Sequence, residues 1–323
     1  MKIHSHPLFQ RLMKVCLTSL TLTLSVTANA ADPPRIALVM KSLANPYFVT
    51  MAEGARAHSR EHAAHYDLLI TGIQNETDSA GQIRILEQLI IEKVDAIVLA
   101  PADSGNLVPV VSKALDAGVT VINIDNKLDD RVLAEAGINV PFVGASNTKG
   151  AIMVGSYLAK KLRAKDKVAI IEGISTTTNA KARTAGFRAS MESAGIEVIE
   201  IQSGQWESAV AEKIATEMLQ RHPDLKAILC GNDIMALGVT AAVHAAGLEG
   251  RVKIIGYDNI SPIAPMLADG RILATVDQFA GQQAVFGIEL ALKALIGSSS
   301  PLAPILQPHA DKLVREVANI QLH

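Results

Sequence analysis

The sequence predicts an α/β protein made of two lobes, each built on a doubly wound parallel sheet. Apolar runs rich in Val and Ile alternate with amphipathic stretches of helical periodicity along nearly the whole chain, which is the pattern of successive strand–helix units. The apolar runs are continuous rather than alternating, as in strands that helices cover on both faces. Ten such runs are present, more than one compact sheet usually holds, so two sheets of about five strands each are predicted.

The strands and helices follow from these runs in chain order. The first five strands are predicted at 36–40, 67–72, 95–100, 119–125 and 142–146, and the next five at 167–173, 197–201, 226–230, 252–258 and 273–277. Amphipathic helices are predicted between them, among others at 78–92, 147–163, 207–221 and 280–296. Open parallel sheets bind ligands beyond the carboxyl ends of their strands. The residues that follow each strand are therefore the candidates for function.

The first 30 residues have the three parts of a secretory signal peptide. Lys2, Arg11 and Lys14 give a basic start, residues 15–26 form a short apolar run, and residues 28–30 (Ala-Asn-Ala) supply a small-residue cleavage pattern. The apolar run is too short to cross a bilayer, which needs roughly 20 residues. A buried strand or a membrane anchor is the alternative. We predict export to the periplasm with cleavage near Ala30.

Composition and charge limit the classes of function. The chain has 323 residues, of which 49 % are hydrophobic and 19 % charged, as in globular proteins with sizeable cores. Removing the 3 basic residues of the signal peptide from the 30 in the chain leaves 27 against 32 acidic residues, a net charge of −5. An acidic chain argues against a nucleic-acid partner. Cys230 is the one cysteine of the mature chain, so no intramolecular disulfide can form, which fits a bacterial periplasm better than an animal secretome.

Polar planar groups and the scarce aromatic rings follow the predicted strands. They are Asn45, Tyr47 and Phe48 after the first strand, Asp125 and Asn126 at the fourth, Arg183 beyond the sixth, Trp206 after the seventh, Asn232 after the eighth, Asp258 at the ninth and Gln278 at the tenth. Taken singly, each is better explained as a helix cap or a turn residue. Together they are typical of a site for a polyhydroxylated ligand, because aromatic faces cover C–H surface while carboxylate, amide and guanidinium groups bond to neighbouring hydroxyls. Such a site needs no cofactor.

Several motifs resemble, in the same order, the ribose-binding branch of the periplasmic sugar-binding proteins, which have the type I Venus flytrap fold. The motifs are SLANPYF (42–48), VINID (121–125), ARTAGF (182–187), GNDIMALG (231–238), IIGYDN (254–259) and LATVDQ (273–278). The resemblance implies two lobes that are joined by three crossings and close over a sugar. The implied first lobe is 31–146 plus about 279–307, and the second is 147–278 plus about 308–323.

The same resemblance implies the ligand shell and the partners. Asn45, Tyr47, Phe48 and Asp125 would come from the first lobe, and Arg183, Trp206, Asn232, Asp258 and Gln278 from the second lobe or the hinge. The protein would be a monomer that delivers a monosaccharide or sugar alcohol to an inner-membrane ABC permease. Signalling through a chemoreceptor is compatible with that role.

Asn126 is a departure from the ribose-binding pattern, in which an arginine typically follows this aspartate. An amide in place of a five-donor guanidinium weakens recognition of a ring oxygen and its neighbouring hydroxyl. The sequence therefore predicts a ligand other than ribose, either another monosaccharide or an acyclic polyol.

Two other classes of function compete with sugar binding. His58, Glu61 and His62 form an H-x-x-E-H motif with His65 nearby, the spacing of a zinc enzyme on a helix; the alternative is an exposed helix end. A sugar-sensing transcription regulator shares the two-lobe core but carries a basic DNA-binding segment where this chain has a signal sequence. We expect a binding protein without metal or catalytic residues.

Overall fold

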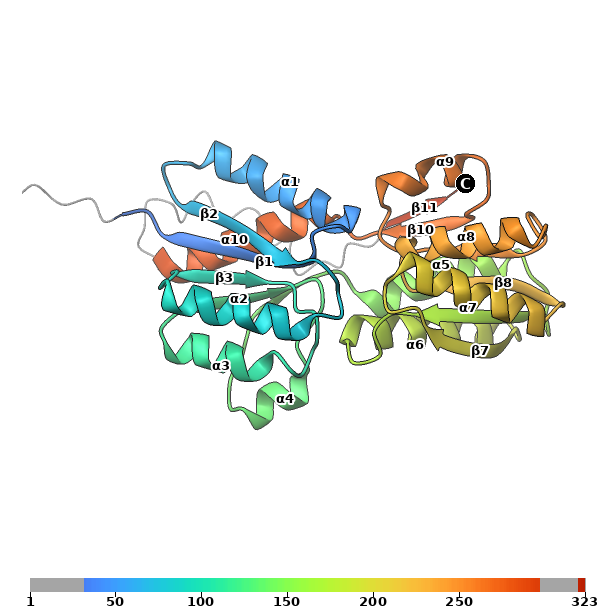
Figure 1. Cartoon of the computed structure of the whole chain (residues 1–323), viewed down its shortest axis with the longest axis horizontal. Helices are drawn as coiled ribbons and strands as arrows, with labels where there is room; N and C mark the ends of the chain where they lie inside the picture. Colours follow the sequence, from blue (N-terminus) through green and yellow to red (C-terminus); the bar gives the residue numbers. More distant parts are fainter. Residues whose placement is uncertain (1–31, 297–318, 323) are drawn as a thin grey trace, which may run out of the picture. The chain divides into compact units, whose positions relative to one another are not determined.

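The strands form two separate sheets in the computed structural model, which describes residues 32–296 and 319–322 (Figure 1). The first sheet has the strand order β2-β1-β3-β4-β5, and the second β11-β10-β9-β8-β6-β7. In both sheets the paired strands run parallel, except that β11 is antiparallel to β10 in the second sheet. We call the first sheet with its helices the first lobe, and the second sheet with its helices the second lobe. The predicted signal peptide and residues 297–318 lie outside the described residues.

The first lobe takes its elements from most of the first half of the chain and one later helix. They are β1 (Arg35–Ser42), α1 (Pro46–Glu61), β2 (Asp67–Ile73), α2 (Ser79–Ile91), β3 (Ala96–Leu99), α3 (Val108–Asp116), β4 (Thr120–Ile124), α4 (Asp130–Glu135), β5 (Phe142–Val143) and α10 (Ala280–Ile296).

The second lobe takes the elements between β5 and α10, together with the last strand. They are α5 (Asn147–Ala159), β6 (Lys167–Glu172), α6 (Thr178–Ser193), β7 (Glu197–Ser203), α7 (Ser208–Arg221), β8 (Leu225–Cys230), α8 (Asp233–Ala245), β9 (Lys253–Ile255), the short 3-10 helix Ser261–Ile263, α9 (Ala264–Ala268), β10 (Ala274–Asp277) and β11 (Asn319–Leu322).

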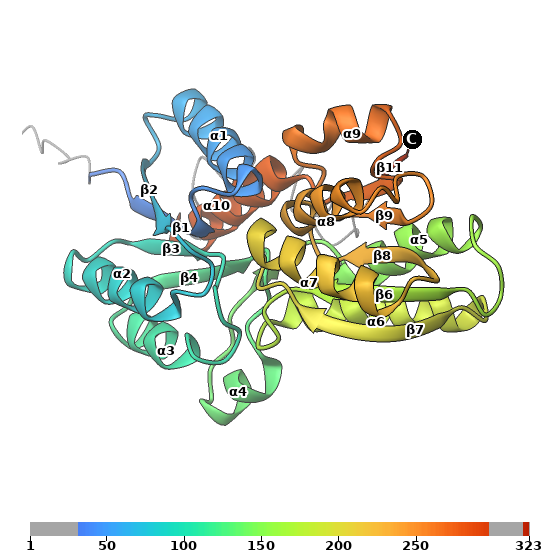
Figure 2. The same cartoon turned by 45° about the vertical axis from the view of Figure 1, so that its right-hand side comes forward.

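Helices cover both faces of the first sheet, which explains the continuous apolar strands. Along β1, Ile36 and Leu38 pack into the core beneath α1 and α10, while Ala37 and Val39 pack beneath α2 and α3. Figures 1 and 2 show α2 and α3 together on one face and α1 with α10 on the other. Since strand side chains alternate between faces, a strand buried on both faces has apolar residues at every position.

The second sheet is covered in the same way. Ala169 and Ile171 of β6 pack with the cluster that contains α7 and α8, while Val168 and Ile170 pack with α5 and α6. The α/β class and the two parallel sheets predicted from the sequence are confirmed, and each of the ten predicted strands corresponds to one of β1 to β10. The strand β11 was not predicted, because a four-residue run at a sheet edge carries almost no periodic signal.

The chain re-enters the first lobe at the start of α10. Phe279, between β10 and α10, has a φ of 54°, a left-handed conformation that turns the chain sharply. The helix then packs against α1, where Gly54 and Gly281 face each other so closely that a Cβ on Gly54 would lie 2.6 Å from the Gly281 Cα. These two glycines let the helix backbones approach, which places α10 on the first sheet.

No helix in the described part of the chain is long and apolar enough to cross a membrane.

Asp233, the first residue of α8, is a carboxyl buried in the second lobe. Its oxygens accept hydrogen bonds from the Thr275 hydroxyl at 2.8 Å and from the Ile260 backbone N–H at 3.1 Å. Burial raises the pKa of Asp233 to about 7, although these hydrogen bonds act in the opposite direction. The carboxyl joins α8, the loop after β9 and strand β10.

This carboxyl should make stability depend on pH. The folded protein holds its proton up to about pH 7, whereas an unfolded aspartate releases it near pH ~4. The folded state therefore binds more protons between these values, and the free energy of unfolding should fall as the pH rises from about 4 to 7. Urea unfolding at pH 5 and pH 8 measures this change. Between these pH values the free energy of unfolding should fall less in Asp233→Asn than in the wild type. Equal losses in the two proteins would contradict the assignment.

Candidate ligand-binding site

One small pocket collects charged and aromatic side chains from the carboxyl ends of strands in both sheets. The empty space among its lining atoms, open solvent included, is about 210 Å³. Its lining is Lys41, Asn45, Tyr47, Phe48, Glu76 and Asp125 of the first lobe and Asn179, Arg183, Trp206, Asn232 and Asp258 of the second. A molecule held in this pocket would contact both lobes.

Eight of the ten residues predicted from the sequence line this pocket. They are Asn45, Tyr47, Phe48, Asp125, Arg183, Trp206, Asn232 and Asp258. Gln278 does not line the pocket but contacts a residue that does, since its Nε2 donates to Asp258 Oδ1 at 2.6 Å. Asn126 is outside the pocket: its amide donates to the Pro101 carbonyl at 2.9 Å and its oxygen accepts from the start of α6.

Sequence reasoning missed three lining residues, Lys41, Glu76 and Asn179. Lys41 continues the apolar run of β1, Glu76 follows β2, and Asn179 lies at the start of α6 after β6. All three lie at or after the end of a strand, as Asp125 does, so the rule that selected Asp125 could also have selected them. Lysine and glutamate are, however, usually exposed to solvent, so position alone does not separate a pocket residue from a surface residue.

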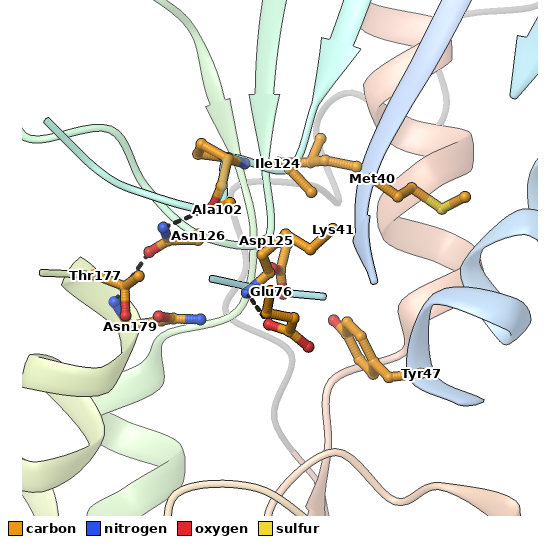
Figure 3. A network of polar contacts seen from close by, with 12 residues as sticks. Met40, Lys41, Tyr47, Glu76, Ala102, Ile124, Asp125, Asn126, Thr177 and Asn179 are labelled. Carbon is orange, nitrogen blue, oxygen red and sulfur yellow. Dashed lines mark hydrogen bonds and ion pairs between the residues drawn. The ribbon is translucent and has the colours of Figure 1, made fainter. Parts of the chain in front are cut away.

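The first-lobe wall is a buried ion cluster centred on Lys41. The Lys41 amine lies 3.2 Å from Glu76 Oε2 and 3.3 Å from Asp125 Oδ2, and Asn45 Nδ2 donates to Glu76 Oε1 at 3.0 Å. Burial lowers the pKa of the Lys41 amine, but Glu76 and Asp125 outweigh it and raise the pKa above 10.5. The amine is therefore charged, and it joins two carboxylates in the floor of the pocket (Figure 3).

The aromatic part of the wall comes from the turn between β1 and α1. Asn45 caps α1 by accepting from the Tyr47 backbone N–H at 3.0 Å, and Pro46 occupies the first helical position, where its missing N–H is not needed. This fixed start places Tyr47 and Phe48 with ring centres 5.1 Å apart at an interplanar angle of 86°. The Lys41 amine lies 5.4 Å from the centre of the Phe48 ring.

Arg183 organises the second-lobe wall. Its Nε donates to Asn147 Oδ1 at 2.7 Å, and its Nη1 to the Gly231 carbonyl at 2.8 Å and Asp258 Oδ1 at 3.4 Å. The guanidinium carbon also lies 3.9 Å from the centre of the Tyr257 ring. These contacts hold the guanidinium in one orientation, with its charge beside Asp258.

Asp258 is held in an environment that disfavours its charge. Burial raises the pKa of Asp258 well above its ordinary range, the Arg183 guanidinium acts against this, and the carboxyls of Asp233 and Asp125 add to the rise. A carboxyl in this state can accept hydrogen bonds from hydroxyl groups and, when protonated, donate one.

Trp206 provides a second aromatic wall and has an unusual backbone conformation. Its φ is 65°, and Asp125 and Asp258 also have positive values of 61° and 118°. Such conformations are rare for residues other than glycine and cluster at functional sites. The indole lies directly against Gly173, where any Cβ would overlap the ring. Among the described residues, the buried Trp206 Nε1 has no hydrogen-bond partner, so it is available to a ligand oxygen.

The H-x-x-E-H motif lies away from this pocket, at the end of α1. His58 is buried, with its Nδ1 2.8 Å from the Tyr66 hydroxyl and its Nε2 3.7 Å from Glu289 Oε1. The His62 ring stacks on it at 4.2 Å. Within the described ranges no three His, Cys, Asp or Glu residues are grouped as metal ligands. His58 thus links α1 to Tyr66 and α10 instead of facing an exposed helix end.

Residues 36–299 match the family of periplasmic binding protein domains. The chain belongs to the periplasmic binding protein family. A D-ribose/D-allose-binding protein of Pseudomonas aeruginosa is 57 % identical to it over 287 residues, which are 89 % of this chain and 90 % of that protein. The resemblance to ribose-binding proteins that the motifs indicated is thereby confirmed.

Solved structures of solute-binding proteins have the same fold as this periplasmic binding protein. A solute-binding protein of an ABC transporter from Burkholderia multivorans, with an unknown ligand represented as alpha-D-erythrofuranose, superposes with a TM-score of 0.83 at 54 % identity, covering 90 % of this chain and 99 % of that one. A second, from Actinobacillus succinogenes with bound D-allose, has a TM-score of 0.77 at 34 % identity and covers 81 % of this chain and 91 % of that one.

Proposed function

We propose that this protein is the exported solute-binding component of an ATP-driven importer and that it binds one neutral aldose between its lobes. The observation that carries the proposal is the small pocket in which Tyr47, Phe48 and Trp206 accompany five ionisable side chains. Aromatic rings cover the C–H faces of a sugar, while carboxylates, the amine and the guanidinium bond to its hydroxyls. The names of the relatives support a sugar as the ligand.

The charges of the pocket favour a neutral sugar over a phosphorylated one. Three carboxyls (Glu76, Asp125 and Asp258) face two cations (Lys41 and Arg183), and each cation already has a carboxylate partner. A phosphate group would have to compete with these carboxylates at short range. Neutral hydroxyl groups can instead donate to the carboxylates and accept from the cations at once.

Within the neutral sugars we propose an aldose of the D-ribose or D-allose type. The Pseudomonas relative is named for these two sugars, and the Actinobacillus structure holds D-allose. They share the same configuration at three successive hydroxyl-bearing carbons, so one set of protein groups can bind both. Asn126 no longer favours an acyclic polyol, because it lies outside the pocket and the Lys41 amine lies beside Asp125.

Fluorescence of the single tryptophan tests this proposal. Trp206 lines the pocket, so a bound sugar should change its emission. We expect D-allose and D-ribose to change it at micromolar or lower concentration, and ribitol and D-ribose 5-phosphate to have no effect in that range. Saturation by ribitol at lower concentration than by either aldose would favour a sugar alcohol as the ligand. No change in fluorescence with any neutral sugar would refute a sugar-binding role.

Localisation and partners belong to the same proposal. The relatives that are named import binding proteins or parts of ABC transporters support an inner-membrane permease as the partner. Because one chain supplies both lobes of the pocket, a monomer suffices for binding, and neither a cofactor nor catalytic residues are required. A chemoreceptor is a second candidate partner.

The N-terminal segment predicts where the mature protein begins. We expect N-terminal sequencing of protein isolated from the periplasm to start at Ala31 or Asp32, because Ala28-Asn29-Ala30 forms the cleavage pattern. An intact Met1 terminus on periplasmic protein would contradict the proposed export route.

A further inference from the structure

The first turn of α6 is capped by side chains of the other lobe. Thr177, the N-cap residue, makes no side-chain capping bond. The Thr178 backbone N–H donates instead to Ser104 Oγ at 2.9 Å, and the Asn179 N–H to Asn126 Oδ1 at 3.2 Å. Ser104 follows β3 and Asn126 follows β4, both in the first sheet, whereas α6 follows β6 in the second.

The Thr178 side chain adds to the same contact. Its hydroxyl lies 2.6 Å from the Lys127 carbonyl and 3.0 Å from Asn126 Oδ1, both acceptors of the first lobe. The other N–H groups of the helix start are satisfied inside the second lobe, since Ala180 donates to Asn179 Oδ1 and Thr177 to the Ile174 carbonyl. Two of the N–H groups that a helix start leaves free are thus satisfied only by the other lobe.

Asn126 is oriented for this task. Its Nδ2 donates to the Pro101 carbonyl at 2.9 Å and lies 3.1 Å from Ser104 Oγ, so its oxygen must face α6. Figure 3 shows its side chain turned toward Thr177 and Asn179, on the opposite side from Tyr47 and Glu76. The two first-lobe side chains of this contact are buried, with exposed fractions of 0 % for Asn126 and 1 % for Ser104, and Thr178 is half-buried.

We propose that Asn126, Ser104 and Thr178 form an interlobe latch that positions α6 and sets ligand affinity through lobe closure. The α6 helix carries Asn179 and Arg183, which line the pocket, and Asp125 directly precedes Asn126. The approach of the lobes that brings these groups around a ligand therefore also caps the helix. Since apparent affinity falls with the fraction of protein in the binding-competent state, every latch bond that favours closure tightens binding. This inference rests on the proposed sugar-binding function for its affinity readout.

Substitutions at two neighbouring threonines separate a latch from a purely local role. Thr178→Val removes the hydroxyl that crosses to the first lobe, and Thr178→Ser restores it. Thr177→Val is the control at the neighbouring position, because the buried Thr177 hydroxyl donates to the Ile174 carbonyl within the second lobe at 2.7 Å. We expect Thr178→Val to weaken D-allose binding about tenfold, through faster dissociation. Thr178→Ser and Thr177→Val should bind as the wild type does.

Small-angle X-ray scattering of the ligand-free proteins provides a readout that needs no sugar. Thr178→Val should have a larger radius of gyration than the wild type and Thr177→Val, because fewer molecules are closed. Wild-type affinity and an unchanged radius in Thr178→Val would overturn the latch, as would equal losses of affinity in the two valine variants. If the wild type bound no sugar, the proposed function would fail, and the scattering comparison would still decide whether the latch exists.

Discussion

Replacing Arg183 by methionine is expected to weaken aldose binding at least a hundredfold, the largest loss among the pocket residues. The guanidinium donates to Asn147, to the Gly231 carbonyl and to Asp258, and its carbon lies 5.5 Å from the centre of the Trp206 ring. Each hydrogen bond to a charged group contributes about 1.5–3 kcal/mol, and a hundredfold change corresponds to about 2.7 kcal/mol. Loss of the guanidinium also leaves the Asp258 and Asn147 side chains free to change orientation.

Isothermal titration with D-allose measures this effect, and the same helix provides the control. Arg188 is exposed on α6, so Arg188→Met removes an equal charge without touching the pocket and should bind as the wild type does. Arg183→Lys should fall between the two, because an ammonium keeps the charge but cannot reproduce the planar fork. Wild-type affinity in Arg183→Met would remove this residue from the ligand shell.

Replacing Lys41 by methionine should lower the free energy of unfolding by about 3–5 kcal/mol, the usual cost of removing one partner from a buried ion pair. Lys41 is 3 % exposed and lies between Glu76 and Asp125, whose charges would then be buried without compensation. The exposed pair of Lys113 and Glu87, at 3.2 Å, is the matched control, and Lys113→Met should cost about 0–1 kcal/mol. Urea unfolding at pH 7 compares the two variants.

The pH dependence gives this prediction a second test. In the wild type the pKa of Lys41 is raised, so its contribution is present below the unfolded value near pH ~10.4 and is lost as the pH rises through the higher folded value. Equal costs for Lys41→Met and Lys113→Met, at every pH, would show that the cluster contributes no more than a surface pair.

Local patterns in the sequence were sufficient to predict the two-sheet architecture. The predicted strand 36–40, and residues 168–171 of the predicted strand 167–173, are apolar at every position because helices cover both faces, and that pattern is visible without any contact information. Residues at the ends of such strands meet at one edge of each sheet for topological reasons, which is why Asp125, Arg183 and Asp258 could be named as a set. The exception, β11, pairs antiparallel with β10 from the far end of the chain, and nothing local records that pairing.

The direction in which each strand-end side chain points was decided only by the tertiary structure. Asp125 and Asn126 are neighbours after the same strand, yet Asp125 lines the pocket and Asn126 bonds to Pro101 and to the start of α6. The φ of 61° at Asp125 and the partners of Asn126, which are Pro101 after β3 and Asn179 in α6, send the two side chains in different directions. Lys41 likewise could be read as a solvated lysine until Glu76 and Asp125 were found within 3.3 Å of its amine. Strand position is a local property of the chain, whereas charge pairing and side-chain direction depend on segments that only folding brings together.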